Sequence, residues 1–389
     1  MAGVYRGCFG NTSAAIALGH SHLVARGLVA ASDRANHLVF GPGIPIYLHR
    51  FLIMVSRRVL FKLCTLALLA VVLLNVVVAR VSSNSLPKSH LRDIASHSES
   101  QVTMLGNSVV AAVFDAKAFE DSWRLKNGEN IHAFNAGFGG SASVEHYLIG
   151  RQILHLQPEC KTVIFGFFDH ALTDPTQCPV SKIIGNRTVA FLYEPDLAAP
   201  YLSDSWFDQK MFSVLARVPL YVERGAYWGK VELLRRKTGG LGMPPEAYNK
   251  FGRVRDFSLV AVPDSDTFKK RCSDAVAGNA EIAPVLVALF SEVMAAGKNI
   301  RIVALPVSPE HRKGRYDTAE WGTYCQHLER KLAAFDCRIE YADDWLTADK
   351  FADHLHPNPL GAAEFSSRLA SEWSGWRPNR PGAPFSSPK

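Results

Sequence analysis

The chain lacks the cysteine patterns that bind metal ions or staple small secreted domains. It has seven cysteines in 389 residues, and none forms a Cys-x-x-Cys pair or another spacing typical of a zinc site. Cys8 and Cys64 lie in segments set apart below, so an odd number remains. A disulfide between Cys160 and Cys178 is permitted but not decided by the sequence. We therefore expect no metal ion and no other cofactor.

The chain also lacks a concentrated basic region. Lys and Arg number 43 against 36 Asp and Glu, a net charge of +7, but the basic residues are spread along the sequence and no nucleic-acid recognition module is present. A short cluster of Arg235, Arg236 and Lys237 is typical of a solvated helix end. Contact with anionic lipid or an acidic polymer at a membrane surface is the alternative for this cluster. We expect no nucleic-acid partner.

One long hydrophobic run is present. Residues 59–79 include only three polar side chains, and about twenty apolar residues are enough to span a bilayer core. Arg57 and Arg58 lie just before the run, so the positive-inside rule leaves the N-terminus cytoplasmic. We predict a signal anchor over 54–80 in the inner (cytoplasmic) membrane, with the rest of the chain in the periplasm or outside the cell. A cleaved signal is the alternative, but this run is long for a secretory signal.

Composition divides the remainder of the chain. Residues 1–53 show no helical or strand period, and Met54 opens the run MVSRR, which is typical of the start of a signal anchor. We therefore expect a poorly structured leader and translation from Met54. A polar stalk, 81–101, is too rich in Ser, His and Lys to build a core. The other expected parts are a folded domain over 102–376, an insertion within it at about 170–278, and a disordered tail over 377–389.

Strand-like and helix-like patterns alternate across the folded domain. Short apolar runs are followed by longer segments with apolar residues at helical spacing. The expected strands are 102–105, 131–135, 162–167, 300–305 and 337–341. The expected helices are 109–123, 143–156, 281–296, 319–335 and 359–373. This alternation predicts an α/β domain with a parallel sheet covered on both faces, whose ligands bind at the carboxyl ends of the strands.

Two short motifs at opposite ends of this domain carry the candidate chemistry. A Gly-Asn-Ser turn ending at Ser108 follows the first expected strand, and the run DHLHP at 353–357 precedes the last expected helix. A serine hydroxyl becomes a nucleophile when an imidazole accepts its proton and a carboxylate holds that imidazole in the right tautomer. Ser108, His356 and Asp353 supply these three groups.

Each of these residues also has a structural explanation. Ser108 could cap the helix that follows it, Asp353 could cap a helix or close a turn, and His356 could be a half-buried polar residue. His354 and His356 could suggest a metal pair, but no carboxylate or cysteine shows a zinc-type spacing to them. The order of the motifs and their placement after expected strand ends favour the catalytic interpretation.

The chain resembles the SGNH (GDSL-like) hydrolase superfamily over roughly 102–373, apart from the insertion. Its best stretch is ADHLHPNPLGAAEF, in which Asp-x-x-His precedes a helix start as in that family. The resemblance implies a flavodoxin-like, three-layer α/β/α fold with Ser108 as nucleophile, His356 as base and Asp353 as the orienting carboxylate. It also implies that the backbone N–H groups of Ser108 and of Gly140, in NAGFGGS, donate to the oxyanion.

The segment that follows the third expected strand departs from the family's pattern. In the run GFFD at 166–169, Phe168 stands where the family has an asparagine that donates to the oxyanion, and losing one such donor costs about two to three orders of magnitude in rate. Asn107 in place of the family's Asp is tolerable, because that position is not the nucleophile. Asp169 and Asp174 could pose as the paired carboxylates of a glycoside hydrolase, although Asp169 is better explained as a residue that stabilises its loop.

Divergent membrane-anchored relatives, similar to the accessory proteins of alginate acetylation and of teichoic-acid D-alanylation, share the anchor and such departures. The resemblance therefore implies an extracytoplasmic serine acyl-ester hydrolase or acyltransferase acting on an O-acylated envelope or exported polysaccharide, with a membrane O-acyltransferase as a candidate partner. A catalytically silent binding or scaffold subunit of a polysaccharide-modification assembly is the alternative, for which Phe168 is the best argument. The insertion's aromatics, including Trp206, are expected in the core more than on a sugar-binding platform.

Overall fold

The computed structural model describes residues 57–81, 86–174, 194–223, 262 and 264–373. The chain divides into two compact units, Met1–Val76 and Val77–Lys389. Several expectations fall outside the described residues: the leader at 1–53, the start at Met54, the tail at 377–389, the basic cluster at 235–237 and Cys178.

Helix α3 (Arg57–Val81) contains the hydrophobic run. Its segment Val59–Arg80 is long and apolar enough to cross a membrane, and it is the one such segment among the residues that the structure describes. The uncharged polar side chains Thr65 and Asn75 each bond to the carbonyl four residues earlier, at 2.8 and 2.9 Å. These bonds satisfy polar groups that hydrocarbon could not, so the helix is compatible with a single-pass anchor.

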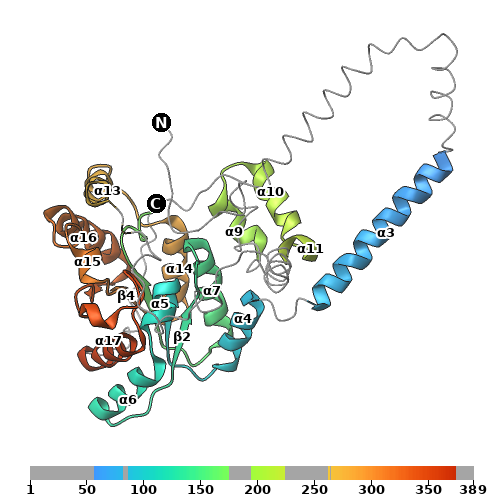
Figure 1. Cartoon of the computed structure of the whole chain (residues 1–389). Coiled ribbons are helices and arrows are strands. Elements are labelled where there is room, and N and C mark those ends of the chain that lie inside the picture. The colour runs from blue at the N-terminus through green and yellow to red at the C-terminus, as the bar shows by residue number, and fades with distance from the viewer. Residues whose placement is uncertain (1–56, 82–85, 175–193, 224–261, 263, 374–389) are drawn as a thin grey trace, which may run out of the picture. The chain divides into compact units, whose positions relative to one another are not determined.

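A parallel sheet forms the centre of the second unit (Figure 1). Its strand order is β2-β1-β3-β4-β5, and the strands are β1 (Val102–Gly106), β2 (Ala133–Gly137), β3 (Thr162–Phe167), β4 (Asn299–Ala304) and β5 (Ile339–Tyr341). In the sequence, helices α15 (Pro309–Arg312) and α16 (Ala319–Leu332) connect β4 to β5. Every residue of β1 and β3 is buried, as expected for strands covered on both faces.

Helices cover both faces of this sheet. One group comprises α5 (Ser108–Val113), α6 (Ala116–Asn127) and α17 (Pro359–Glu372), and the other comprises α7 (Ser143–Leu156) and α14 (Pro284–Ala295). A Cβ at Gly106 of β1 would meet Val110 of α5, whereas Leu105 of β1 lies against Gly150 of α7. Successive strand residues point to opposite faces, so the two groups lie on opposite sides. The predicted α/β/α architecture is confirmed.

The predicted helix over 109–123 is divided in two. Phe114 is extended, and Asp115 caps α6 by accepting a hydrogen bond from Ala118 N at 3.0 Å. The backbone N–H of Asp115 donates to Ser366 Oγ of α17 at 2.8 Å. The prediction of one continuous helix is wrong because Asp115 supplies a new N-cap at the break.

The expected stalk over 81–101 also requires correction. Residues Leu86–Ser96 form helix α4, which packs against α7 and β2. Ile94 is fully buried, Leu91 is 9% exposed, and the Ile94 carbonyl accepts from Gln157 Nε2 at 3.2 Å. Two apolar residues three positions apart are enough to bury one side of a short helix despite its polar composition.

The described parts of the insertion contain several helices. Its helices are α9 (Pro195–Leu202), α10 (Trp206–Leu215), α11 (Pro219–Val222) and α13 (Ser265–Ala277). Helix α9 packs on α7, where Arg151 donates to Glu194 at 2.6 Å and the Tyr147 ring lies 5.6 Å from the Tyr201 ring. Trp206, expected in the core, is instead 69% exposed.

The close approach of α5 to β2 leaves no room for a side chain at Gly137. A Cβ at this position would lie 2.3 Å from the backbone nitrogen of Ala111, which cannot move without shifting α5. We expect Gly137→Ala to lower the free energy of unfolding by about 1–3 kcal/mol, the usual cost of overpacking. Chemical denaturation measures this loss.

Gly322 in α16 is the matched control, because a Cβ there meets nothing within 4 Å. Gly322→Ala should stabilise the protein by roughly 0.5–1 kcal/mol through helix propensity. Equal denaturation midpoints for Gly137→Ala and the wild type would contradict the close packing of α5 on β2.

Candidate active site

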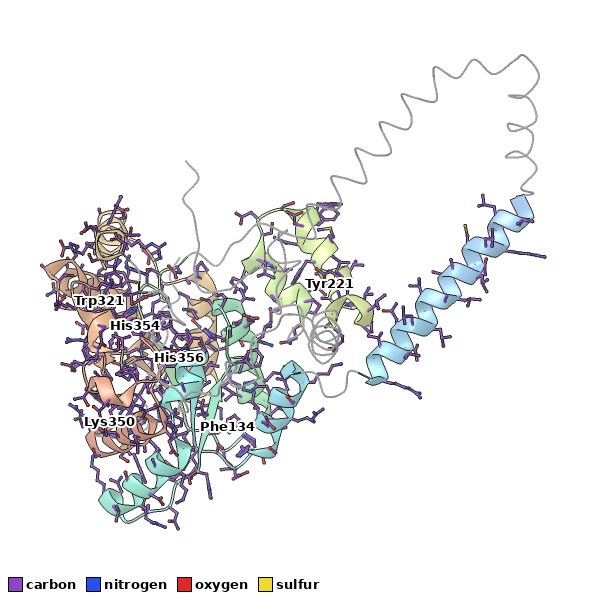
Figure 2. The ribbon with its side chains drawn as sticks, in the orientation of Figure 1. Phe134, Tyr221, Trp321, Lys350, His354 and His356 are labelled. Atoms are coloured by element: carbon purple, nitrogen blue, oxygen red, sulfur yellow. The ribbon has the colours of Figure 1, made fainter. Side chains whose placement is uncertain are left out.

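The carboxyl ends of the parallel strands gather the candidate residues at one edge of the sheet. Ser108 follows the end of β1, and His356 lies in the turn that precedes α17 (Figure 2). Ser108 Oγ and His356 Nε2 are 3.0 Å apart, although the two residues are separated by 248 positions in sequence. The parallel fold thus brings together the two motifs that the sequence analysis singled out.

Asp353 completes the set on the other side of the imidazole. Its Oδ1 and Oδ2 lie 2.9 and 2.8 Å from His356 Nδ1. The same carboxylate accepts the backbone N–H groups of Leu355 and His356, both at 2.8 Å. Asp353 therefore closes its own turn, as the structural explanation expected, and also holds the imidazole.

The charge of Asp353 follows from these contacts. Burial would raise the pKa of its carboxyl, but the hydrogen bond to His356 and the two backbone N–H donors outweigh burial and hold the pKa below its ordinary value. An ionised Asp353 favours the imidazole tautomer with its proton on Nδ1, and this tautomer presents the Nε2 lone pair to the Ser108 hydroxyl. This arrangement can remove a proton from serine.

The turn that carries His356 is closed by its own backbone. Ala352 N donates to His356 O at 2.8 Å, and Asn358 N donates to Lys350 O at 2.8 Å. The Asn358 side chain caps α17 by accepting from the N–H groups of Leu360 and Gly361. Residues 350–361 therefore form a compact unit that fixes the position of the imidazole.

Asn107, rather than Ser108, caps helix α5. Its Oδ1 accepts from Val109 N at 2.9 Å, while Ser108 Oγ contacts His356. The alternative in which Ser108 serves as the helix cap is therefore wrong. Asn107 supplies the helix cap, and this leaves the serine hydroxyl available for chemistry.

The glycine loop after β2 lies beside the serine. A Cβ at Gly139 would be 3.9 Å from Ser108 Cβ, and Gly140 follows with a φ of 69°, which glycine adopts without strain. Within the described part of the chain, neither the Ser108 N–H nor the Gly140 N–H has a hydrogen-bond acceptor. Both are therefore available as donors, and the oxyanion role of Ser108 and Gly140 stays a prediction.

Ser141 and His146 anchor this loop, a pair that the sequence analysis missed. Ser141 Oγ lies 2.6 Å from Phe138 O, to which it can donate, and 2.8 Å from His146 Nε2. Burial lowers the pKa of His146 to about 3, and its Nδ1 has no hydrogen-bond partner in the described segments. A pKa this low, with no carboxylate to stabilise an imidazolium, makes His146 a poor base for Ser141. A serine five residues before a histidine at a helix start was the available signal.

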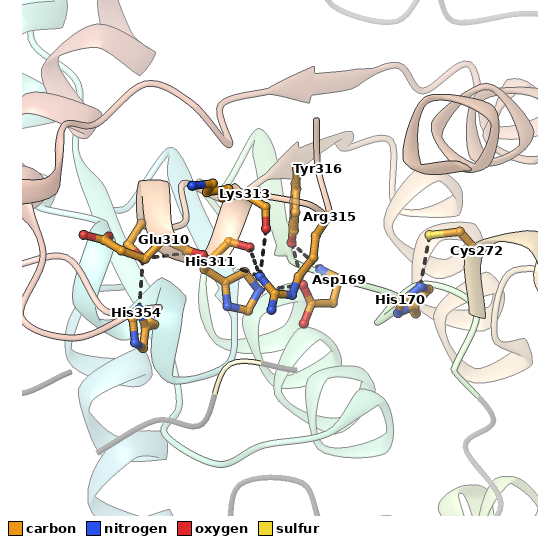
Figure 3. A network of polar contacts seen from close by, with 10 residues as sticks. Asp169, His170, Cys272, Glu310, His311, Lys313, Arg315, Tyr316 and His354 are labelled. Carbon is orange, nitrogen blue, oxygen red and sulfur yellow. Dashed lines mark hydrogen bonds and ion pairs between the residues drawn. The ribbon is translucent and has the colours of Figure 1, made fainter. Parts of the chain in front are cut away.

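The block after β3 makes a buried polar network (Figure 3). Asp169 Oδ1 accepts from Tyr316 OH at 2.7 Å and contacts His311 Nε2 at 3.1 Å. Burial would raise the pKa of Asp169, but the contacts with His311 and Tyr316 bring it below its ordinary value. Phe168 packs against the core. Asp169 thus stabilises its loop, and this network too was missed, because His311 and Tyr316 lie far away in sequence.

This network is joined to the His356 turn. Ser308 Oγ accepts from His311 N at 3.1 Å and lies 3.3 Å from His354 Nδ1, while Ser308 N donates to His354 O at 3.0 Å. The imidazoles of His354 and His356 therefore engage different serines. No group of three or more metal-binding side chains was found among the described residues.

The comparisons with known proteins add little to this geometry. No family model and no curated protein matches the chain. A solved structure described as a lipase/acylhydrolase from Enterococcus faecalis is similar over 70% of this chain and 96% of its own, with 10% sequence identity and a TM-score of 0.28. Similarity at this level carries no assignment, and the α/β fold rests on the strand order and layers described above.

The lowered pKa of Asp353 gives a pH-dependent prediction. A carboxyl with a lowered pKa in the folded state adds stability above its ordinary pKa of 3.8 and loses that contribution as the pH falls through the folded-state pKa. At pH 7 we expect Asp353→Asn to be less stable by roughly 1.5–3 kcal/mol, because a buried charged acceptor is lost. The difference should shrink at pH values below the folded-state pKa.

Denaturation of both proteins at neutral and acid pH measures this difference. Asp344→Asn is the control, since the Asp344 side chain is 61% exposed and should show little difference at either pH. A deficit of Asp353→Asn that is independent of pH would contradict the ionised state assigned to Asp353.

Proposed function

We propose that this chain is a membrane-anchored, extracytoplasmic serine hydrolase or acyltransferase of the SGNH type, acting on O-acyl esters of an envelope or exported polysaccharide. The observation that carries the proposal is the continuous contact from Asp353 through His356 to Ser108, whose N–H makes no hydrogen bond to any residue that the structure describes. If Ser108 were only a helix cap and His356 only a half-buried polar residue, the two would have no reason to contact each other, with Asp353 on the far side of the imidazole.

The reaction follows from the geometry. Ser108 Oγ attacks the ester carbonyl as His356 Nε2 takes its proton, and ionised Asp353 stabilises the imidazolium. The N–H groups of Ser108 and Gly140 donate to the oxygen of the tetrahedral intermediate. His356 then returns the proton to the departing alcohol, which leaves an acyl group on Ser108. Water or a sugar hydroxyl, deprotonated by His356, then attacks this acyl-enzyme, and His356 returns the proton to Ser108 Oγ as the bond from that oxygen to the acyl group breaks.

Phe168 determines how fast this site can work. Its side chain has no hydrogen-bond donor, so it cannot supply the third contact to the oxyanion that the asparagine makes in the related family. The expected penalty is about two to three orders of magnitude in rate. A slow acyl-enzyme suits a protein that is held beside its substrate at a membrane surface, where the local concentration is high.

The membrane part of the proposal is supported by the apolar helix. Val59–Arg80 is compatible with a single span, and the preceding Arg57 and Arg58 favour a cytoplasmic N-terminus. A tethered site acts on what reaches the membrane surface, such as an exported polymer or an acyl carrier made by a membrane O-acyltransferase. Hydrolase and transferase activity are distinguished by whether an added sugar acceptor diverts the acyl group from water.

A catalytically silent binding subunit is the second candidate, favoured only by Phe168. Active-site labelling separates the two candidates. A fluorophosphonate reacts with a serine only when a neighbouring base activates it, so the wild type should be labelled and Ser108→Ala should lose the label completely. Gel fluorescence and peptide mapping measure the label.

Ser122→Ala is the matched control, because Ser122 lies on α6 and should not affect labelling. His356→Ala should also abolish labelling, whereas Asp353→Asn should slow it strongly. In chymotrypsin-type proteases the equivalent change costs about four orders of magnitude in kcat. If the wild type and Ser108→Ala both remained unlabelled, the silent subunit would be the better conclusion.

A further inference from the structure

The turn that carries His356 has a second support besides helix α17. Ser308, in the loop after β4, donates its backbone N–H to the carbonyl of His354 at 3.0 Å. The Ser308 hydroxyl oxygen also lies 3.3 Å from His354 Nδ1. His354 follows Asp353 directly and precedes His356 by two positions. Ser308 therefore contacts the turn at two atoms of a residue that lies between the acid and the base.

Ser308 is itself held firmly in place. It is fully buried and caps helix α15 by accepting a hydrogen bond from His311 N at 3.1 Å. The His311 side chain reaches Asp169 in the loop after β3, with 3.1 Å between Nε2 and Oδ1 (Figure 3). Helix α15 is also tied to the end of β5, because Arg312 Nε donates to Asp343 Oδ2 at 3.0 Å. Loops that follow three neighbouring strands thus fix the serine that contacts the turn.

The contact between Ser308 and His354 is suited to holding the turn rather than to moving a proton. One lone pair of Ser308 Oγ accepts from His311 N, which leaves the hydroxyl proton and a second lone pair. His354 Nδ1 can accept that proton or donate to that lone pair, so either tautomer of His354 keeps the contact. The contact of His356 with Ser108, by comparison, requires one tautomer.

The position of the catalytic imidazole depends on such support. His356 Nε2 lies 3.0 Å from Ser108 Oγ, and a misplacement of about 1 Å can cost about a hundredfold in rate. Helix α17 fixes the C-terminal end of the turn, and Ser308 fixes its middle. We propose that Ser308 and His354 are positioning residues, whose contact holds the His356 imidazole in reach of the Ser108 hydroxyl. This inference rests on the proposed function.

The rate at which a fluorophosphonate labels Ser108 in the full chain tests this role. His354→Leu removes the polar atom that contacts Ser308, and it should slow labelling by about tenfold to a hundredfold. His354→Asn can keep a polar atom close to the position of Nδ1, so it should restore most of the rate. Gel fluorescence over a time course measures these rate constants.

Two controls separate positioning from other effects of substitution. Thr103→Val removes a buried hydrogen bond of 2.6 Å to Gln157, near the start of β1. It should lower the denaturation midpoint without slowing the labelling. Glu310→Gln removes a negative charge that acts on His354 but leaves the contact with Ser308. It should be labelled at the wild-type rate.

Ser308→Ala tests the same contact from its other partner, and does so even if His354→Leu fails to fold. This change removes the hydroxyl but keeps the backbone N–H that donates to His354 O. We expect slowed labelling here too. Because both substitutions remove one shared contact, the double variant should be no slower than the slower single variant. Two effects that multiply would overturn the proposed coupling.

The outcomes distinguish this inference from the proposed function. A wild type that takes no label would overturn both. A labelled wild type whose rate is unchanged in His354→Leu, or is lowered equally by Leu and Asn at this position, would overturn positioning alone and leave the serine hydrolase intact. The same holds if either control slows labelling as much as His354→Leu does, because the effect would then not belong to the contact with Ser308.

Discussion

The packing of α17 against α5 and α6 is the constraint on which the site depends. Ser366 of α17 accepts from Asp115 N at 2.8 Å and donates to Val113 O at 3.4 Å, at the junction between α5 and α6. Ser108 lies at the start of α5, and the turn with His356 lies at the start of α17. Fixing these two helices on one another therefore sets the distance from the serine hydroxyl to the imidazole.

The surroundings of the paired imidazole distinguish Ser108 from Ser141. Apart from the Ser308–His354 contact, two serine–histidine contacts lie at this edge of the sheet, at Ser108 and at Ser141. Only His356 has a carboxylate on Nδ1, so only its Nε2 is held as an acceptor facing the hydroxyl. His146 has no charged partner among the described residues, and burial lowers its pKa to about 3. One arrangement can activate a nucleophile, and the other holds the loop that would bind the oxyanion.

The positions of strands and helices could be predicted well where they depend on local sequence patterns. Helix α7 and strand β3 begin and end where hydrophobic periodicity predicted, and the other predicted strands differ from the observed ones by a few residues. Ser108, Asp353 and His356 could be singled out because short motifs surround them. Helix α4 and the break at Asp115 were not expected, because a two-residue apolar stripe and a cap inside a helical pattern are weak signals.

The features that could not be predicted from the sequence depend on contacts between residues far apart in the chain. The partners of Asp169, His311 and Tyr316, come from a segment after β4, and no spacing in the chain links them. The exposure of Trp206 was equally unpredictable, because an aromatic residue at helical spacing is usually buried. Both features depend on which elements pack together, which local periodicity does not report.

The central claim is that Ser108 carries the acyl group during turnover. Rapid acid quenching of the protein with p-nitrophenyl acetate, followed by peptide mass spectrometry, tests it most directly. The account predicts one acetyl group on the peptide that contains Ser108, absent from Ser108→Ala. A folded protein that hydrolyses the ester with no acetyl on this peptide, or with acetyl elsewhere, would contradict it.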